Sequence, residues 1–384
     1  MSFLETKYAL NGTPFKSEDL DYARLFWKVL IEHADRNWLV KPKGQLAKHW
    51  QSTSISSAVQ LIDLGSMLYA LSESMTSDSE YAFENKVRAL LNSDGVQFEE
   101  QLTELLVGAL LRKLKRQLQL DCPSFYSILE GQKPKNVDYG LHWSNDSKRV
   151  FIEVTVFHIQ KLVDWEAAIS HMMYQFQQAV IKSKLNRALS VTAPLVLNRR
   201  TLPPKVLRKA IQAIANSERG KHEIALGEEV LTLEWTPAVH YKEFPGANEI
   251  DPTSFGFTFG NNIEILTYAG MSMKLAWPGN AEELVNRSLR NTLDLKLKQF
   301  NIGVPYVLMI RILNERVSQK RVIDLLLLRV FSNNKYSRIS AVGLLMLRFS
   351  QDTGYQTHVN FVSNPNAINK LPDDFLSTFT DSQT

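Results

Sequence analysis

Apolar and polar residues alternate over positions 136–157, NVDYGLHWSNDSKRVFIEVTVF, and this pattern predicts two strands joined by a polar turn. Every second residue of Val137 to Trp143 and of Val150 to Val156 is apolar, so the two strands share one face that must be buried. The opposite face carries polar side chains, among them Asp138 and Glu153. The sequence therefore predicts a β-hairpin with one packed face and one face rich in polar groups.

The length of the turn sets which residues of the hairpin face each other. A two-residue loop at Asn145 and Asp146 places Asp138 directly opposite Glu153. The β-carbons of opposed residues lie roughly 4.5–5.5 Å apart, where like charges destabilise a sheet unless they are compensated. A hard divalent cation compensates them because it binds carboxylate oxygens. The alternative is a solvated hairpin whose acidic residues have no function.

Helical spacing of apolar residues dominates the first quarter of the chain. It predicts helices from Ser17 to Leu30, from Ser57 to Ser72 and from Ser79 to Leu91. None of these helices carries polar residues at the spacing of a ligand set. We therefore assign residues 1–95 to a helical N-terminal region that ends in the turn at Asn92 to Gly95.

A helix at Phe98 to Arg112 precedes the hairpin, with Glu99 and Glu104 on its flanks. Three further elements are predicted around the hairpin: a strand at Leu118 to Phe125, a helix at Trp165 to Leu189 and a strand at Ala193 to Leu197. Residues 96–200 then form the central region, and strands alternate with helices in residues 201–384. The whole chain is predicted to have a mixed α/β (α+β) fold with a C-terminal α/β extension.

Composition and charge exclude several classes of protein. The 384 residues are 44% hydrophobic, which supports sizeable cores, and the net charge of +4 permits a polyanionic partner. A single cysteine, Cys122, excludes a disulfide framework and a multi-cysteine zinc site. No GxSxG or HExxH motif is present, and the aliphatic runs are shorter than the ~20 residues of a membrane span. With no export signal at the start, we expect a cytoplasmic protein without a membrane partner.

An acidic residue on a first helix, followed by Asp138 on one strand and Glu153 on the next, resembles the PD-(D/E)xK superfamily of restriction-endonuclease-like nucleases. The resemblance implies an αβββαβ core, within residues 96–200 and completed by part of the C-terminal extension. Carried over residue by residue, it implies that Asp138, Glu153 and the Val154 carbonyl hold a metal ion, and that Glu99 binds a second ion or a metal-bound water. The lysine of the motif is replaced by Thr155, which offers only a hydrogen bond.

The chain is more closely similar to a group of uncharacterised bacterial proteins with Glu-Ala-Thr or Glu-Val-Thr at this position. Three segments carry the likeness in order: Lys296 to Phe300, Val304 to Leu308 and Asn364 to Ala367. The resemblance therefore extends over 98–371. In such nucleases a lysine from a later helix sometimes replaces the missing one, which makes Lys182, Lys184 and Lys296 candidates for this role, the strongest being Lys184 and Lys296.

The resemblance implies a divalent-metal-dependent nuclease that hydrolyses phosphodiester bonds in DNA, in bacterial defence against foreign DNA, with Mg²⁺ or Mn²⁺ as cofactor. It also implies that nucleic acid is the partner, and that the protein forms a homo-oligomer or joins a partner protein of a defence system. The missing lysine leaves an alternative open. In that alternative the chain is a catalytically inactive nuclease-like protein that binds nucleic acid or acts as a scaffold.

Overall fold

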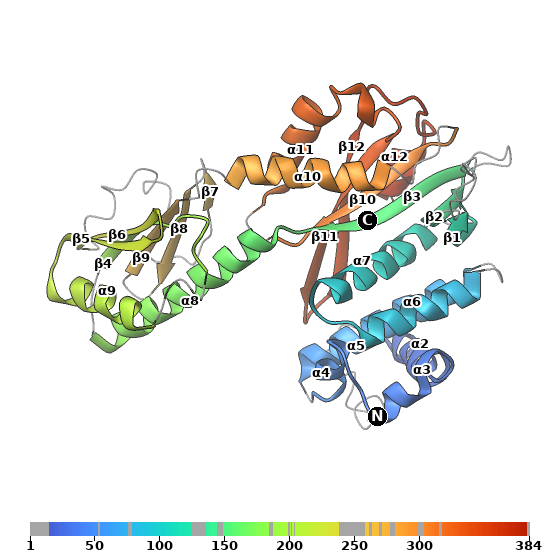
Figure 1. Cartoon of the computed structure of the whole chain (residues 1–384). Coiled ribbons are helices and arrows are strands. Elements are labelled where there is room, and N and C mark those ends of the chain that lie inside the picture. Colours follow the sequence, from blue (N-terminus) through green and yellow to red (C-terminus); the bar gives the residue numbers. More distant parts are fainter. Residues whose placement is uncertain are drawn as a thin grey trace. The chain divides into compact units, whose positions relative to one another are not determined.

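The structure of the protein is a computed structural model of the 384-residue chain. It describes residues 15–52, 54–75, 79–114, 116–123, 136–143, 149–183, 187–198, 200, 202, 204–237, 258–260, 263–268, 271–276, 281–297, 303–314 and 317–381. Helices and strands of both units give a mixed α/β fold, as the sequence predicts (Figure 1). The predicted hairpin loop at Asn145 and Asp146 lies outside the described residues.

The chain divides into two compact units, Met1–Phe157 with Leu289–Thr384, and His158–Ser288. This division does not follow the predicted boundaries at residues 95 and 200. The N-terminal helices share one core with the central strands, and strands from the last third of the chain pair with the same sheet. The second unit is therefore an insertion within the first.

The first unit is built on a six-stranded sheet in the order β1-β2-β3-β10-β11-β12. Its strands are β1 (Leu118–Pro123), β2 (Asn136–His142), β3 (Arg149–Phe157), β10 (Tyr306–Ile312), β11 (Ala341–Ser350) and β12 (Gly354–Ser363). The first three strands are antiparallel, whereas β10 runs parallel to both β3 and β11. A parallel pair needs a crossover connection, and here it consists of the whole second unit and helix α10 (Ala281–Leu297).

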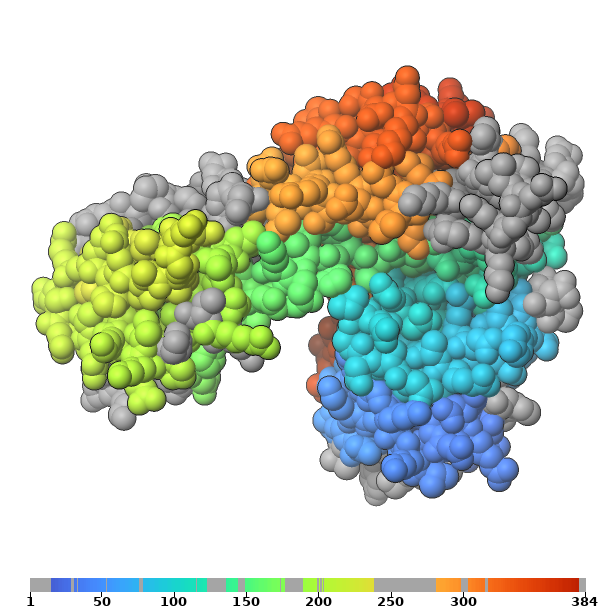
Figure 2. All heavy atoms as spheres, in the orientation of Figure 1, coloured from blue at the N-terminus to red at the C-terminus, as the bar shows by residue number. Residues whose placement is uncertain are grey.

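Helices of the N-terminal region cover one face of this sheet. They are α2 (Ser17–Leu25), the π-helical turn η2 (Phe26–Leu30), α3 (Ile31–Val40), α4 (Leu46–Trp50), α5 (Ile55–Ser72), α6 (Glu80–Asn92) and α7 (Gly95–Arg112). Figure 2 shows these blue and cyan segments packed into one body. Their buried side chains form a single cluster with Ile152 and Val154 of β3, so the predicted apolar face of the hairpin is confirmed as core. The C-terminal part adds α11 (Gln319–Leu325), η6 (Leu326–Val330), η7 (Asn334–Tyr336) and α12 (Phe375–Asp381).

The second unit has its own sheet, in the order β5-β6-β4-β9-β8-β7. Its elements are α8 (Gln160–Ser183), β4 (Arg187–Thr192), α9 (Pro204–Asn216), β5 (Gly220–Leu226), β6 (Glu229–Pro237), β7 (Thr258–Gly260), β8 (Ile263–Tyr268) and β9 (Met271–Ala276). The strand predicted at Ala193 to Leu197 is wrong. The strand lies earlier, at β4, where the alternating Leu189 and Val191 are both buried.

Among the described residues, one helix, α5, is long and apolar enough by length and composition to cross a membrane, and half of it is buried. It contacts α2, α7 and strand β12 of the first unit. These contacts are those of a core helix in a folded domain.

Asp63 on α5 is a partly buried acid that ties this helix to the last hairpin of the sheet. Its Oδ2 accepts a hydrogen bond from the backbone N–H of Tyr355 on β12 at 2.5 Å. Burial raises the pKa of Asp63 from its ordinary 3.8 to about 6, against the opposing effect of that hydrogen bond. The folded protein therefore binds the Asp63 proton more tightly than the unfolded chain does.

Because of this difference, the free energy of unfolding should fall as the pH rises from about 4 to about 6, and the loss should be complete above that range. Asp63→Asn keeps an acceptor for Tyr355 but cannot ionise. We expect it to raise the free energy of unfolding at neutral pH by about 1–2 kcal/mol, since a pKa unit is worth about 1.4 kcal/mol and partial exposure reduces the effect. Urea unfolding at a series of pH values measures this, with the exposed Asp352→Asn as control. A pH-independent difference between wild type and Asp63→Asn contradicts the prediction.

Candidate metal centre

Strands β2 and β3 pair with the predicted register, in which Tyr139 lies opposite Ile152. The ladder of paired residues ends there. At the next position, Asp138 uses its side chain instead, and its Oδ2 accepts the backbone N–H of Val154 at 2.7 Å. The carboxylate of Asp138 is thereby held beside β3, where the two strands stop pairing.

Strand β1 brings a second aspartate to the same place. Leu120 lies opposite Tyr139 on β2, which sets the next residue, Asp121, opposite Asp138. Among the described residues Asp121 alone, apart from glycines, has its backbone in the left-handed region, with φ of 48°. That conformation costs most residues with a β-carbon roughly 1–2 kcal/mol, and aspartate is one of the few that adopt it. Such strain clusters at functional sites, and here it occurs at a residue whose carboxylate joins an acidic group.

Helix α7 supplies the third carboxylate, from Glu104. The Tyr139 hydroxyl donates a hydrogen bond to the Glu104 carbonyl oxygen at 2.8 Å, which fixes the helix against β2. The close approach requires a glycine, because a β-carbon at Gly108 would lie 2.5 Å from the Tyr139 hydroxyl oxygen. Backbone packing thus determines where the Glu104 side chain lies.

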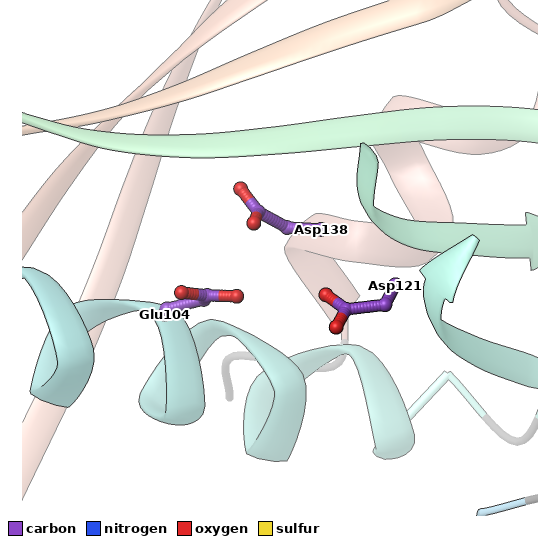
Figure 3. Close-up of side chains that lie close together, drawn as sticks. All are labelled: Glu104, Asp121 and Asp138. Atoms are coloured by element: carbon purple, nitrogen blue, oxygen red, sulfur yellow. The ribbon is translucent and has the colours of Figure 1, made fainter. Parts of the chain in front are cut away.

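The three carboxylates converge, as Figure 3 shows. One oxygen from each of Glu104, Asp121 and Asp138 lies within 4.8 Å of the other two. The ammonium of Lys86, from α6, lies among them: it pairs with Glu104 and is 3.0 Å from Asp121 and 3.8 Å from Asp138. One lysine thus faces three carboxylates, and the group can accept further positive charge.

Burial makes these charges interact strongly. The side chains of Lys86 and Glu104 are only 14% and 12% exposed. Burial raises the pKa of Glu104 well above its ordinary value, and the charge of Asp138 raises it further. Burial alone would lower the pKa of Lys86, but the carboxylates of Glu104 and Asp138 outweigh it and raise this pKa. Lys86 therefore stays protonated, and the ionised form of Glu104 is disfavoured.

Glu153 lies outside the group of three and faces helix α10. It is 3% exposed, and its Oε1 is 2.5 Å from the Nζ of Lys296. Its Oε2 has no hydrogen-bond partner among the described residues although it is buried. Burial and then the charge of Asp138 raise the pKa of Glu153 to about 7, with Lys296 opposing. Asp138 thus interacts with Glu104 on one side and with Glu153 on the other.

Glu99, the predicted helical ligand, does not join the group of carboxylates that the structure brings together. Its Oε2 pairs with Arg311 on β10 at 2.7 Å, and Arg311 also donates to the Thr103 hydroxyl at 3.0 Å. Five positions along a helix amount to about 140° of rotation, so Glu99 and Glu104 point in different directions. Glu104 could have been identified from its position, because it is a carboxylate within the stretch 102–111, all of which is buried.

The other predicted site residues differ in whether the structure describes them and in what they contact. Lys296 contacts Glu153, whereas Lys184 lies outside the described residues, and the side chain of Lys182 is also not among them. Thr155 is partly exposed, two positions after Glu153 on the same strand. The backbone N–H of Val154 points toward β2, and its carbonyl points to the same side because both groups of a strand residue do.

Sequence patterns gave no indication of Lys86 or Asp121. In the helix that contains Lys86, the sequence pattern identifies only the apolar residues. For Asp121 it predicts only that the residue lies in a strand. Comparison of the chain with protein-family models, with curated proteins and with solved structures finds no match. The candidate centre is therefore defined by the geometry of this chain alone.

Proposed function

We propose that the protein is a divalent-metal-dependent nuclease that hydrolyses phosphodiester bonds, with DNA as its substrate. The observation that carries the proposal is the meeting of Glu104, Asp121 and Asp138 from a helix and two strands. Carboxylate oxygens are the ligands that Mg²⁺ and Mn²⁺ prefer. The buried, unpartnered Oε2 of Glu153 next to this group fits the same kind of ion.

The order of elements supports the same function. Helix α7 is followed by three antiparallel strands, β1 to β3, and then by α10 and the parallel strand β10. This order is compatible with the αβββαβ core that the restriction-endonuclease-like resemblance implies, when the second unit, which ends at Ser288 within α10, is counted as an insertion. In that arrangement the carboxylates lie on α7, β1, β2 and β3, and α10 provides a lysine.

Each residue then has a role set by its position. Glu104, Asp121 and Asp138 would hold the ion, with Glu153 and the Val154 carbonyl beside it. Such an ion supplies charge neutralisation at the phosphate and lowers the pKa of an attacking water. The Nζ of Lys296, next to Glu153, can orient a water or take part in moving its proton. Lys86 neutralises the carboxylates, and its ammonium group must be displaced when an ion binds.

One observation favours a second candidate function. Lys86 already gives each of the three carboxylates an ion-pair partner, as a purely structural cluster would require. A catalytically inactive nucleic-acid-binding protein could keep such a cluster. The two candidates differ in whether the carboxylates bind a divalent ion.

Asp138→Asn tests this difference, because asparagine keeps an acceptor for the Val154 N–H and removes the charge. We expect its Mn²⁺ affinity, measured by calorimetry, to fall by more than roughly 100-fold, beyond the cost of changing a residue that only supports a ligand. Without metal, its free energy of unfolding should hold or rise, since repulsion with Glu104 is relieved.

Glu100→Gln, exposed on the same helix α7, is the matched control and should bind Mn²⁺ as the wild type does. If Asp138→Asn binds Mn²⁺ with unchanged affinity, or if the wild type binds none, the metal centre is refuted. The inactive binding protein is then preferred.

A further inference from the structure

Charge is sharply segregated in the second unit. Residues 167–217 contain eight lysines and arginines and no aspartate or glutamate. The chain has 40 acidic residues in 384, so a stretch of this length would ordinarily hold about five. Since the whole chain carries +4, this segment carries +8 and the remainder −4. All eight of these cations fall within residues 182–209, and three of them lie on helix α9.

Helix α9 displays part of this charge on one face. Its buried residues, Leu207, Ala210 and Ile214, pack with α8 against the sheet of the second unit. Figure 1 shows α9 and α8 running along the same side of that sheet. The opposite face of α9 is exposed and carries three cations: Lys205, Arg208 and Lys209.

Arg200, four residues before the start of this helix, is exposed as well. Among the described residues, neither Arg200 nor the three cations of α9 has an ion-pair partner, whereas Lys221 on β5 pairs with Glu223. Lys205 and Lys209 are four residues apart on the helix, which is about 6 Å along its axis. These four exposed residues, called the α9 cation row below, therefore offer uncompensated positive charge to a partner.

The chemistry of the row selects the kind of partner. Unpaired lysines and arginines on an exposed helix face match the phosphates of a nucleic-acid backbone, which arginine binds with two parallel hydrogen bonds. A helix that binds a lipid surface needs exposed apolar residues beside its cations. The apolar residues of α9 are turned inward to the sheet instead. The row lacks the groups that a membrane requires.

We propose that the α9 cation row binds the phosphate backbone of the nucleic acid that the metal centre cleaves. This inference rests on the proposed function for the identity of the ligand. Every residue of the candidate metal centre, including Lys86, Glu153 and Lys296, belongs to the first unit. The second unit is then a binding module, and the row acts through affinity alone.

The test replaces three cations of the row at once, as Lys205→Gln, Arg208→Gln and Lys209→Gln. All three are exposed, so the fold should persist, which circular dichroism checks. Binding of a fluorescein-labelled DNA duplex is measured by anisotropy in EDTA, where no cleavage can occur. The control removes the same charge from exposed positions of the first unit, as Lys320→Gln, Arg329→Gln and Lys370→Gln.

We expect the α9 variant to lose more than about tenfold in DNA affinity, and the control to lose much less. The slope of log K against log salt should decrease by about 2.7, because each neutralised phosphate contributes about 0.9. Equal losses in the two variants, or a wild type that does not bind DNA, overturn the proposal. So does a variant that loses binding to vesicles of anionic phospholipid while its DNA affinity is unchanged, an outcome that identifies a membrane as the partner.

The same experiment separates this proposal from the proposed function. If the wild type binds DNA through the row but cleaves none with Mg²⁺ or Mn²⁺, the row stands and the nuclease activity fails. If the wild type cleaves DNA and the α9 variant binds it with unchanged affinity, the activity stands and the row fails.

Discussion

Replacing Lys86 by methionine should destabilise the protein strongly in EDTA, and divalent ions should restore much of the loss. Methionine keeps the apolar stem of the lysine and removes its charge. Glu104, Asp121 and Asp138 would then lie together without the ammonium that pairs with them. Removing one partner of a buried ion pair costs about 3–5 kcal/mol, because the remaining charge stays buried and uncompensated. Part of that charge here is relieved by protonation of Glu104, whose pKa is already raised.

Urea unfolding of Lys86→Met in EDTA and in Mg²⁺ measures this prediction. The free energy of unfolding should drop by about 3 kcal/mol in EDTA relative to wild type. In Mg²⁺ the difference should shrink, since an ion at free concentration c that binds only the folded protein stabilises it by RT ln(1 + c/Kd), which is larger for the protein that binds the ion more tightly. The variant should also bind Mn²⁺ more tightly than wild type, because no ammonium has to be displaced.

Lys48→Met, an exposed position on α4, is the control and should behave as wild type in both solutions. A loss of stability that is equal in EDTA and in Mg²⁺ would mean that Lys86 serves only the structure. The carboxylates would then be an ion-pair cluster without a metal.

Local sequence patterns were sufficient to predict the parts of the fold that depend on the buried face of a single helix or strand. The alternation around Tyr139 and Ile152 predicted both the hairpin and its register, because a slip by one residue would expose the entire apolar face. Apolar spacing likewise predicted α7, whose end at Arg112 agrees with the prediction and whose start lies three residues before the predicted Phe98.

Contacts between distant segments could not be predicted in this way. Strand β10 pairs with β3 although the second unit separates them in the chain, so the boundaries of the units follow from the sheet and not from composition. The same holds for the site. Glu99 and Glu104 lie on one helix, and only the contact between Tyr139 and the Glu104 backbone fixes which carboxylate meets Asp138.

The charged residues of the site show most clearly what local sequence patterns cannot predict. Lys86 comes from a helix that the sequence describes only by its apolar face, and it is buried only because three acids surround it. Asp121 reaches them through a left-handed backbone conformation, for which no glycine or asparagine gave a signal. Both depend on tertiary packing that overrides local preference.

If the protein cleaves DNA as we propose, Lys296→Met should abolish most of that activity while leaving the DNA affinity unchanged. Lys296 is the one lysine that the described structure places against Glu153, with its Nζ 2.5 Å from Oε1. Thr155 stands at the position of the lysine in the PD-(D/E)xK motif that the sequence resembles, and it can only share a hydrogen bond. A positioned proton-transfer group contributes about 10²–10⁴-fold to a rate. We therefore expect the single-turnover rate with Mg²⁺ to fall by at least about 100-fold.

Two further variants separate this role from a structural one. Lys296→Arg keeps the charge next to Glu153 but holds its proton permanently, so it should restore stability without restoring the cleavage rate. Lys184→Met removes the other lysine that the sequence suggested and should cleave DNA at the wild-type rate. If Lys296→Met retains full activity and Lys184→Met loses it, Lys184 supplies the lysine of the site instead. If the wild type cleaves no DNA with any divalent ion, Lys296 only neutralises the buried Glu153, and the catalytically inactive nucleic-acid-binding protein is the preferred candidate.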